Sequence, residues 1–204
     1  MASIAQPSHA ERPHNLTTLY DRDRYTWAIQ QAAALKRRDF DAVDWDNVTG
    51  EIEALVTQQE SSLKSQYARI IEHFLKLRYR TDQEAGNIAG WTISIDDARN
   101  QITDLLEEYP GLSPKQEHLF NQAWPRARRK TIDAFIPPPP RSLTDPTTVL
   151  REKKRLTREW DRFLPQNNPF SRRQAEDRYW LPERHASPQR PQNRRRSDSL
   201  DWTG

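Results

Sequence analysis

Apolar side chains early in the chain recur at helical spacing. In residues 21–38 they fall three and four positions apart and so share one helical face: Tyr25, Ala28, Ile29, Ala32 and Leu35. Asp21 and Asp23 suit the positive N-terminal end of a helix dipole, and residues 36–38, Lys-Arg-Arg, suit the negative end. The pattern predicts an amphipathic helix over about residues 21–38.

The longest apolar pattern runs from about residue 45 to residue 80. Its positions keep the same spacing throughout: Val48, Ile52, Leu55, Val56, Leu63, Tyr67, Ile70, Ile71, Phe74 and Leu77. Polar Gln59 and Gln66 interrupt this stripe. A helix of this length extends roughly 54 Å at 1.5 Å per residue. No other pattern is as long, so this helix is the expected central element.

Two further helices are predicted before residue 135. One spans about residues 90–108 and ends before Pro110-Gly111. The other begins after Ser113, which we expect to act as N-cap, with Gln116 completing a capping box. Pro125 falls inside it, where a proline costs on the order of 3 kcal/mol. The predicted fold class is all-α, with residues 18–135 forming a small antiparallel helical bundle built on one long central helix.

The chain changes character after residue 135. Residues 1–135 carry 17 Lys and Arg against 20 Asp and Glu, whereas residues 136–204 carry 15 against 9 and ten of the 15 prolines. Residues 136–166 are expected to form a proline-rich segment with one amphipathic helix, capped by Asp145 and started by Pro146. Residues 1–17 and the basic tail 183–204 are expected to be flexible and disordered.

Composition narrows the possible classes of protein. The low hydrophobic fraction, 34%, fits a modest helical core with much of the chain outside it. Cysteine is absent, which excludes disulfides and thiolate chemistry. Neither a secretory signal nor an apolar stretch of membrane-spanning length is evident. The expectation is a soluble cytoplasmic protein without membrane attachment.

Three stretches resemble the bacterial domain of unknown function 29 family, an all-helical family common in cyanobacteria. They are YDRDRYTWAIQQAAALKRRDFDAVDWDNVTGEIEAL at 20–55, IEHFLKLRY at 71–79 and GWTISIDDARNQI at 90–102, and NQAWPRARRKTI at 121–132 is also similar. NPFSRRQAEDRYWLP, from residue 168 to Pro182, resembles the family's C-terminal ending. The resemblance implies that residues 167–182 are a family-like C-terminal segment packing on the bundle. It also implies that the proline-rich residues 136–166 are an inserted segment.

This sequence departs from the family pattern at three positions. Gly50 replaces a common acidic residue, Asn168 replaces a common cysteine, and Pro125 lies within a helix. The resemblance implies a helical bundle but no established function. It supplies no catalytic residues.

An acidic cluster precedes and opens the long helix. An EF-hand loop counted from Asp39 would need glycine at its sixth position and glutamate at its twelfth, but Asp44 and Gly50 stand there. Asp44 is instead predicted to cap the helix. Glu51 and Glu53 lie about 200° apart around it and cannot share a ligand.

Other candidate interface residues are His73, Lys76, Trp91 and Arg99. We expect His73 to be a boundary residue with a satisfied ring, Trp91 to be a core anchor, and Arg99 to form an ion pair near Glu72. About 33 Å of helix separates Glu51 from His73, so one straight helix cannot bring them into one site.

Three functions remain open. A non-enzymatic helical protein-protein interaction module, with a protein partner or as a homodimer, fits best, because the chain lacks known catalytic and phosphate-binding motifs. No catalytic, cofactor-binding or metal-binding residues are assigned. The first alternative is nucleic-acid association through the basic C-terminal third, including Arg194, Arg195 and Arg196. The second is an uncharacterised hydrolase with a site formed across subunits.

Overall fold

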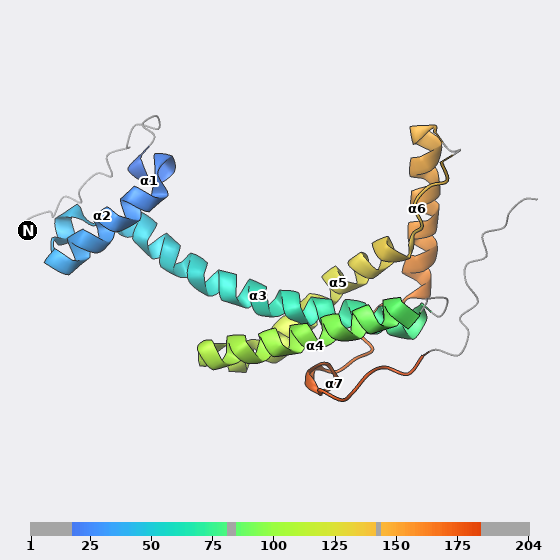
Figure 1. Cartoon of the computed structure of the whole chain (residues 1–204). Coiled ribbons are helices and arrows are strands. Elements are labelled where there is room, and N and C mark those ends of the chain that lie inside the picture. Colours follow the sequence, from blue (N-terminus) through green and yellow to red (C-terminus); the bar gives the residue numbers. More distant parts are fainter. Residues whose placement is uncertain (1–17, 81–84, 142–143, 185–204) are drawn as a thin grey trace, which may run out of the picture. The chain divides into compact units, whose positions relative to one another are not determined.

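The computed structural model describes residues 18–80, 85–141 and 144–184 (Figure 1). Within these ranges it contains α-helices, two 3-10 helices and no strand, which confirms the all-α fold class. The long central helix is also confirmed: α3 runs from Trp45 to Tyr79. The predictions for residues 1–17, and for the tail from residue 185 onward with its three arginines, lie outside the described residues.

The chain divides into two compact units, residues 1–57 and residues 58–204. The first contains α1 (Leu19–Arg22), α2 (Arg24–Arg37), the 3-10 helix η1 (Phe40–Ala42) and the start of α3. The second contains the rest of α3, α4 (Ala85–Glu108), η2 (Pro110–Lys115), α5 (Gln116–Phe135), α6 (Pro146–Phe163) and α7 (Arg172–Glu176). Each unit is described by itself below.

The helix predicted over residues 21–38 is two helices separated at Asp23. Thr18 and Asp21 form a capping box at the start of α1. The Asp23 carboxylate then accepts a 3.0 Å hydrogen bond from the Thr26 backbone N–H and caps α2. Aspartate competes for nearby backbone donors in this way, and Asp23 takes a non-helical conformation as a result.

The core of the first unit is small. Its buried hydrophobic residues, among those described, are Trp27, Ala34 and Val43. The apolar face read from the sequence of α2 points elsewhere, because Tyr25 is 78% exposed and Ile29 and Leu35 are also exposed. The helical period located α2 correctly, but the buried side of α2 is its Trp27 side.

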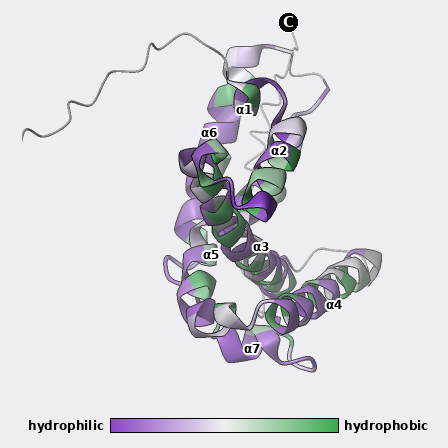
Figure 2. Ribbon diagram, turned by 90° about the vertical axis from the view of Figure 1, so that its left-hand side faces the viewer, coloured by the Kyte–Doolittle hydropathy of each residue, from purple (hydrophilic) through white to green (hydrophobic). Residues whose placement is uncertain are grey.

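The second unit has an extensive core. It is formed by the C-terminal half of α3 with α4, η2 and α5, and it includes fully buried Leu63, Tyr67, Phe74, Ile95 and Phe120. Figure 2 shows hydrophobic and hydrophilic positions alternating along these helices. Tyr67 and Phe120 meet edge to face with ring centroids 5.4 Å apart.

Segments after residue 135 pack onto this core through aromatic side chains. On α6, Trp160 lies 4.6 Å from Phe135 and Phe163 lies 5.8 Å from Tyr79, measured between ring centroids. Farther along the chain, Phe170 and Trp180 lie 5.2 Å and 5.1 Å from Phe74. Edge-to-face pairs of this kind contribute about 0.5–1.5 kcal/mol each beyond the area that they bury.

The start of α5 differs from the prediction. Residues 110–115 form η2, and the residue before α5 is Lys115, which makes no side-chain capping hydrogen bond. Ser113 is therefore not the N-cap, because the 3-10 turn already holds its backbone. Pro125 does lie inside α5. Both Pro125 and Asn121, whose carbonyl loses its hydrogen bond there, are exposed, so water can satisfy that carbonyl.

Candidate functional site

Asp44 caps α3 and also connects it to α2. Its carboxylate accepts hydrogen bonds from the Asn47 backbone N–H at 3.4 Å and from the Trp27 indole N–H at 3.3 Å. Its own backbone N–H donates to Oε1 of Gln31 at 2.7 Å. The predicted capping role is confirmed, and the additional contacts show that this aspartate holds α2 and α3 together.

Glu51 is held by two residues of the first unit. The Tyr20 hydroxyl donates a 2.6 Å hydrogen bond to Oε1 of Glu51, and Arg24 lies 3.5 Å from the same oxygen. The hydrogen bond to this carboxylate raises the pKa of Tyr20. The guanidinium of Arg24 also stacks 4.5 Å from the Tyr20 ring centroid. Glu51 therefore joins α1 and α2 to α3, whereas Glu53 is exposed.

The first turns of α3 expose a row of large apolar side chains. Trp45 is 50% exposed and Ile52 and Leu55 are each 59% exposed, and half-buried Val48 lies between them in sequence. These four residues, which we call the α3 seam, are separated by three, four and three positions. That spacing places them at the a and d positions of two consecutive heptads, where coiled-coil helices contact each other.

No free charge borders the α3 seam. The neighbouring e and g positions of the two heptads hold Thr49, Val56, Gln58 and Glu51. Glu51 is the only charged residue of these four, and it is already paired with Arg24. Asp46 and Glu53 fall at b positions, away from the seam. A helix laid along the seam therefore meets apolar and neutral side chains.

His73 and Lys76 lie near the C-terminal end of α3. The Lys76 ammonium is 2.6 Å from Glu72, which also pairs with Lys130 at 3.8 Å. The Nδ1 atom of His73 is buried and has no hydrogen-bond partner. Burial, followed by the charge of Lys76, lowers the pKa of His73 to about 4. The prediction of a satisfied ring is wrong, because the histidine is held neutral with one nitrogen unpaired.

Arg99 is buried and binds the segment that follows α6. Its guanidinium donates to the carbonyl oxygens of Ala175 at 2.9 Å and of Trp180 at 2.8 Å, with longer contacts to those of Arg178 and Gln174. Its ion pair is with Asp96, at 3.3 Å. The predicted pairing with Glu72 is wrong. Arg99 instead satisfies carbonyls at the end of α7 and in the turn beyond it.

Trp91 packs on the edge of the second unit's core and is half-buried.

The seven residues singled out in the sequence are divided between the two units. Asp44, Glu51 and Glu53 belong to the first unit, and His73, Lys76, Trp91 and Arg99 belong to the second. Within the first unit, Asp44 is hydrogen-bonded to α2, and Glu51 contacts both α1 and α2. Within the second, Lys76 and Arg99 have separate partners, Glu72 and the 174–180 backbone.

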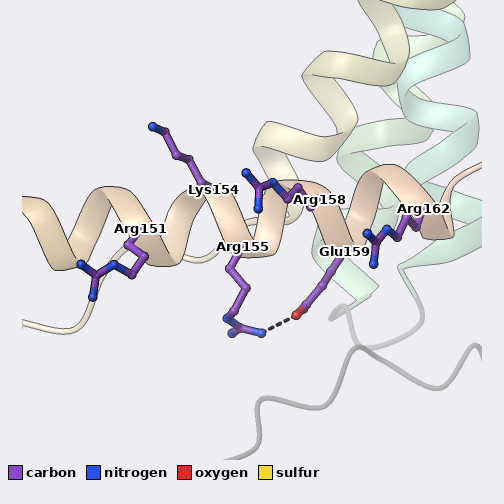
Figure 3. Close-up of a pocket in the computed structure, with 6 residues that line it drawn as sticks. All are labelled: Arg151, Lys154, Arg155, Arg158, Glu159 and Arg162. Atoms are coloured by element: carbon purple, nitrogen blue, oxygen red, sulfur yellow. Dashed lines mark hydrogen bonds and ion pairs between the residues drawn. The ribbon is translucent and has the colours of Figure 1, made fainter.

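A basic surface lies on the outer side of α6. Arg151, Lys154, Arg155, Arg158 and Arg162 are exposed and, with Glu159, line a concavity of about 450 Å³ (Figure 3). Arg155 forms ion pairs with Glu152 and Glu159. Only the basic character of the C-terminal third was noted from the sequence, and this surface was missed. The signal was present as basic residues at three- and four-residue spacing opposite the Leu156–Trp160–Phe163 stripe.

Two kinds of feature are absent from the described ranges. No group of three or more His, Cys, Asp and Glu side chains in them is arranged to hold a metal ion. No helix that the structure describes there has the length and apolar character needed to cross a membrane.

The fold and these surfaces define an all-α protein. The polar residues singled out in the sequence mainly hold its helices and segments together. The family model described as Domain of unknown function DUF29 matches residues 19–181, and the chain belongs to that family. No curated protein and no solved structure matches the chain.

Proposed function

We propose that this chain is a non-enzymatic protein-protein interaction module, that its docking surface is the α3 seam, and that the seam binds a second copy of the chain. The observation that carries the proposal is the exposure of Trp45, Ile52 and Leu55 at coiled-coil spacing. The expected compartment is the cytoplasm.

The described residues of the first unit bury little apolar surface. Its described residues bury Trp27, Ala34 and Val43, while it exposes eight large hydrophobic side chains: Tyr25, Ile29, Leu35, Phe40, Trp45, Ile52, Leu55 and Val56. Units of about 60 residues are already marginal in stability, because they bury a small share of their surface on folding. Since the chain has no cysteine, a partner is the simplest source of the missing burial.

A second copy fits the seam because two identical rows of apolar side chains can pack against each other. Heptad a and d residues of one helix pack between those of another, and identical stripes can interdigitate. Like charges on the flanking positions would oppose such pairing, but these positions are neutral or already paired. Because two copies use the same patch, the resulting dimer closes and does not extend into a filament.

The experiment compares the full-length chain with Ile52→Glu/Leu55→Glu by sedimentation equilibrium over the micromolar range. We expect the parent to be a dimer and the variant a monomer. The two residues are exposed, so the variant should keep its far-ultraviolet circular dichroism. Ile93→Glu/Leu150→Glu is the matched control, because both residues are also exposed, are in the second unit, and lie outside the seam.

Two results would overturn this proposal. One is a parent chain that stays monomeric at all concentrations tested. The other is a seam variant that dimerises as strongly as the parent. If the control variant alone becomes monomeric, the copies meet through the second unit and the seam is not the docking surface.

No observation favours the alternative of a hydrolytic site formed across subunits. Glu51 is hydrogen-bonded to Tyr20, and Arg99 is bound to backbone carbonyls. Both are already used to hold the fold together.

A further inference from the structure

The basic side of α6 has no role in holding the fold together. We propose that Arg151, Lys154, Arg158 and Arg162 form a binding surface for the phosphate backbone of nucleic acid. This surface is separate from the α3 seam, and its function does not depend on self-association.

The four residues lie along one side of a single helix. Their spacing of three, four and four positions confines them to an arc of about 80° and spreads them over roughly 16 Å of helix axis. The opposite side of α6 is anchored, since Trp160 packs on Phe135 and Phe163 on Tyr79. The basic side (Figure 3) therefore stays exposed to solvent, while the apolar side holds α6 in place.

These four charges are uncompensated, whereas three arginines that hold the second unit together are paired. Arg128 pairs with Asp161, Arg172 pairs with Glu117 and Glu176, and Arg99 pairs with Asp96. Among the residues that the structure describes, none of the four on α6 forms an ion pair or a side-chain hydrogen bond. Like charges three and four positions apart on a helix repel each other. A bound polyanion would remove that repulsion.

The anchoring of α6 favours nucleic acid over a lipid surface. An amphipathic helix that binds membranes inserts its apolar face among the lipids. In α6 that face packs on the protein core, through Trp160 against Phe135 and Phe163 against Tyr79. What remains is a row of cations with one exposed apolar residue beside it, Leu150, which is too little apolar surface for membrane insertion and leaves a surface that suits a regularly charged backbone. Because phosphate contacts carry no sequence information, the binding should not depend on sequence.

The test measures binding of the full-length chain to fluorescent mixed-sequence duplex DNA and single-stranded RNA by anisotropy. Four phosphate contacts predict that affinity for duplex DNA falls on the order of 100-fold between 50 and 200 mM salt. In Arg151→Gln/Lys154→Gln/Arg158→Gln/Arg162→Gln we expect binding to be largely lost. For any binding that remains, the slope of log affinity against log salt concentration should become shallower by about 3–4. Comparison of the two probes shows which nucleic acid is preferred.

Two control variants separate this surface from general positive charge. Arg22→Gln/Lys36→Gln/Arg37→Gln/Arg69→Gln removes four exposed cations from α1, α2 and α3 and should keep most of the affinity. Arg194→Gln/Arg195→Gln/Arg196→Gln tests the basic tail. The proposal is overturned if the α6 variant binds like the parent, or if only the tail variant loses binding. Binding to anionic phospholipid vesicles without binding to either nucleic acid would also overturn it.

Discussion

Arg99 shows how one buried side chain fixes a distant part of the chain. Its guanidinium presents several donors in a rigid plane, and these reach carbonyls of four residues between Gln174 and Trp180. Burial lowers the pKa of this arginine, with Asp96 opposing the shift. The charge is therefore tolerated because the carbonyls and one carboxylate surround it.

Arg99→Lys should loosen the 174–184 segment. Lysine keeps the charge but lacks the planar fork, so at least two carbonyls lose their donor, and we expect the free energy of unfolding to fall by about 2–4 kcal/mol. Urea denaturation followed by tryptophan fluorescence, together with limited proteolysis of the segment, measures this. Arg178→Lys is the control, because Arg178 is exposed and makes one 2.9 Å hydrogen bond, to Asn100. Equal stability and protection in the two variants would contradict the assigned role.

His73 makes stability dependent on pH in a defined window. The pKa of His73 is about 4 in the folded chain and 6.5 in the unfolded chain. Below pH 6.5 the unfolded chain therefore binds the proton more readily than the folded chain. Stability should fall as the pH drops from about 6.5 to about 4 and then stop responding to this group. Between pH 7 and pH 5 the loss should be about 1–2 kcal/mol.

His73→Gln tests the assignment, because glutamine cannot titrate. Urea unfolding of both proteins at pH 7 and pH 5 gives the difference that belongs to this residue, since Glu72, Lys76, Arg69 and Lys130 contribute equally to both. We expect the variant to lose less stability on acidification than the parent. Equal losses would assign the pH dependence to carboxylates instead.

At the scale of elements, predictions held where a few neighbouring residues decide the outcome. Asp145 and Pro146 start α6 where expected, with the Asp145 side chain accepting from the backbone of Thr147 and Thr148. Local chemistry also explains two errors. Asp23 ends α1 by capping α2, and the 3-10 turn η2 takes Ser113 out of its expected capping position.

Apolar periodicity predicted the existence of helices better than their burial. The stripe containing Tyr25 and Ile29 marked α2 correctly, yet Trp27 on its other side is the buried residue. Arg99 was likewise placed on the correct helix and given the wrong partner. Its acceptors lie more than 70 residues farther along the chain, and helical spacing carries no information about contacts at that distance.

At the scale of the whole molecule, the two units differ in how much core they possess. The second unit buries hydrophobic side chains from α3, α4, α5 and the segment after α6 in one cluster. The first unit buries Trp27, Ala34 and Val43 among its described residues. Since burial of apolar surface is the main favourable term in folding, the units should differ in independent stability.

A chain divided between Thr57 and Gln58 should therefore give two fragments with different behaviour. We expect residues 58–204 to unfold cooperatively within a few degrees of the full-length chain, because their core is complete without the first unit. Residues 1–57 should be largely unfolded when dilute and gain helix as their concentration rises, since pairing through the α3 seam would supply the missing burial. Circular dichroism melts over a range of concentrations measure both effects. A stable monomeric helical fold in residues 1–57 would show that Trp27, Ala34 and Val43 suffice, and the argument that this unit needs a partner would fail.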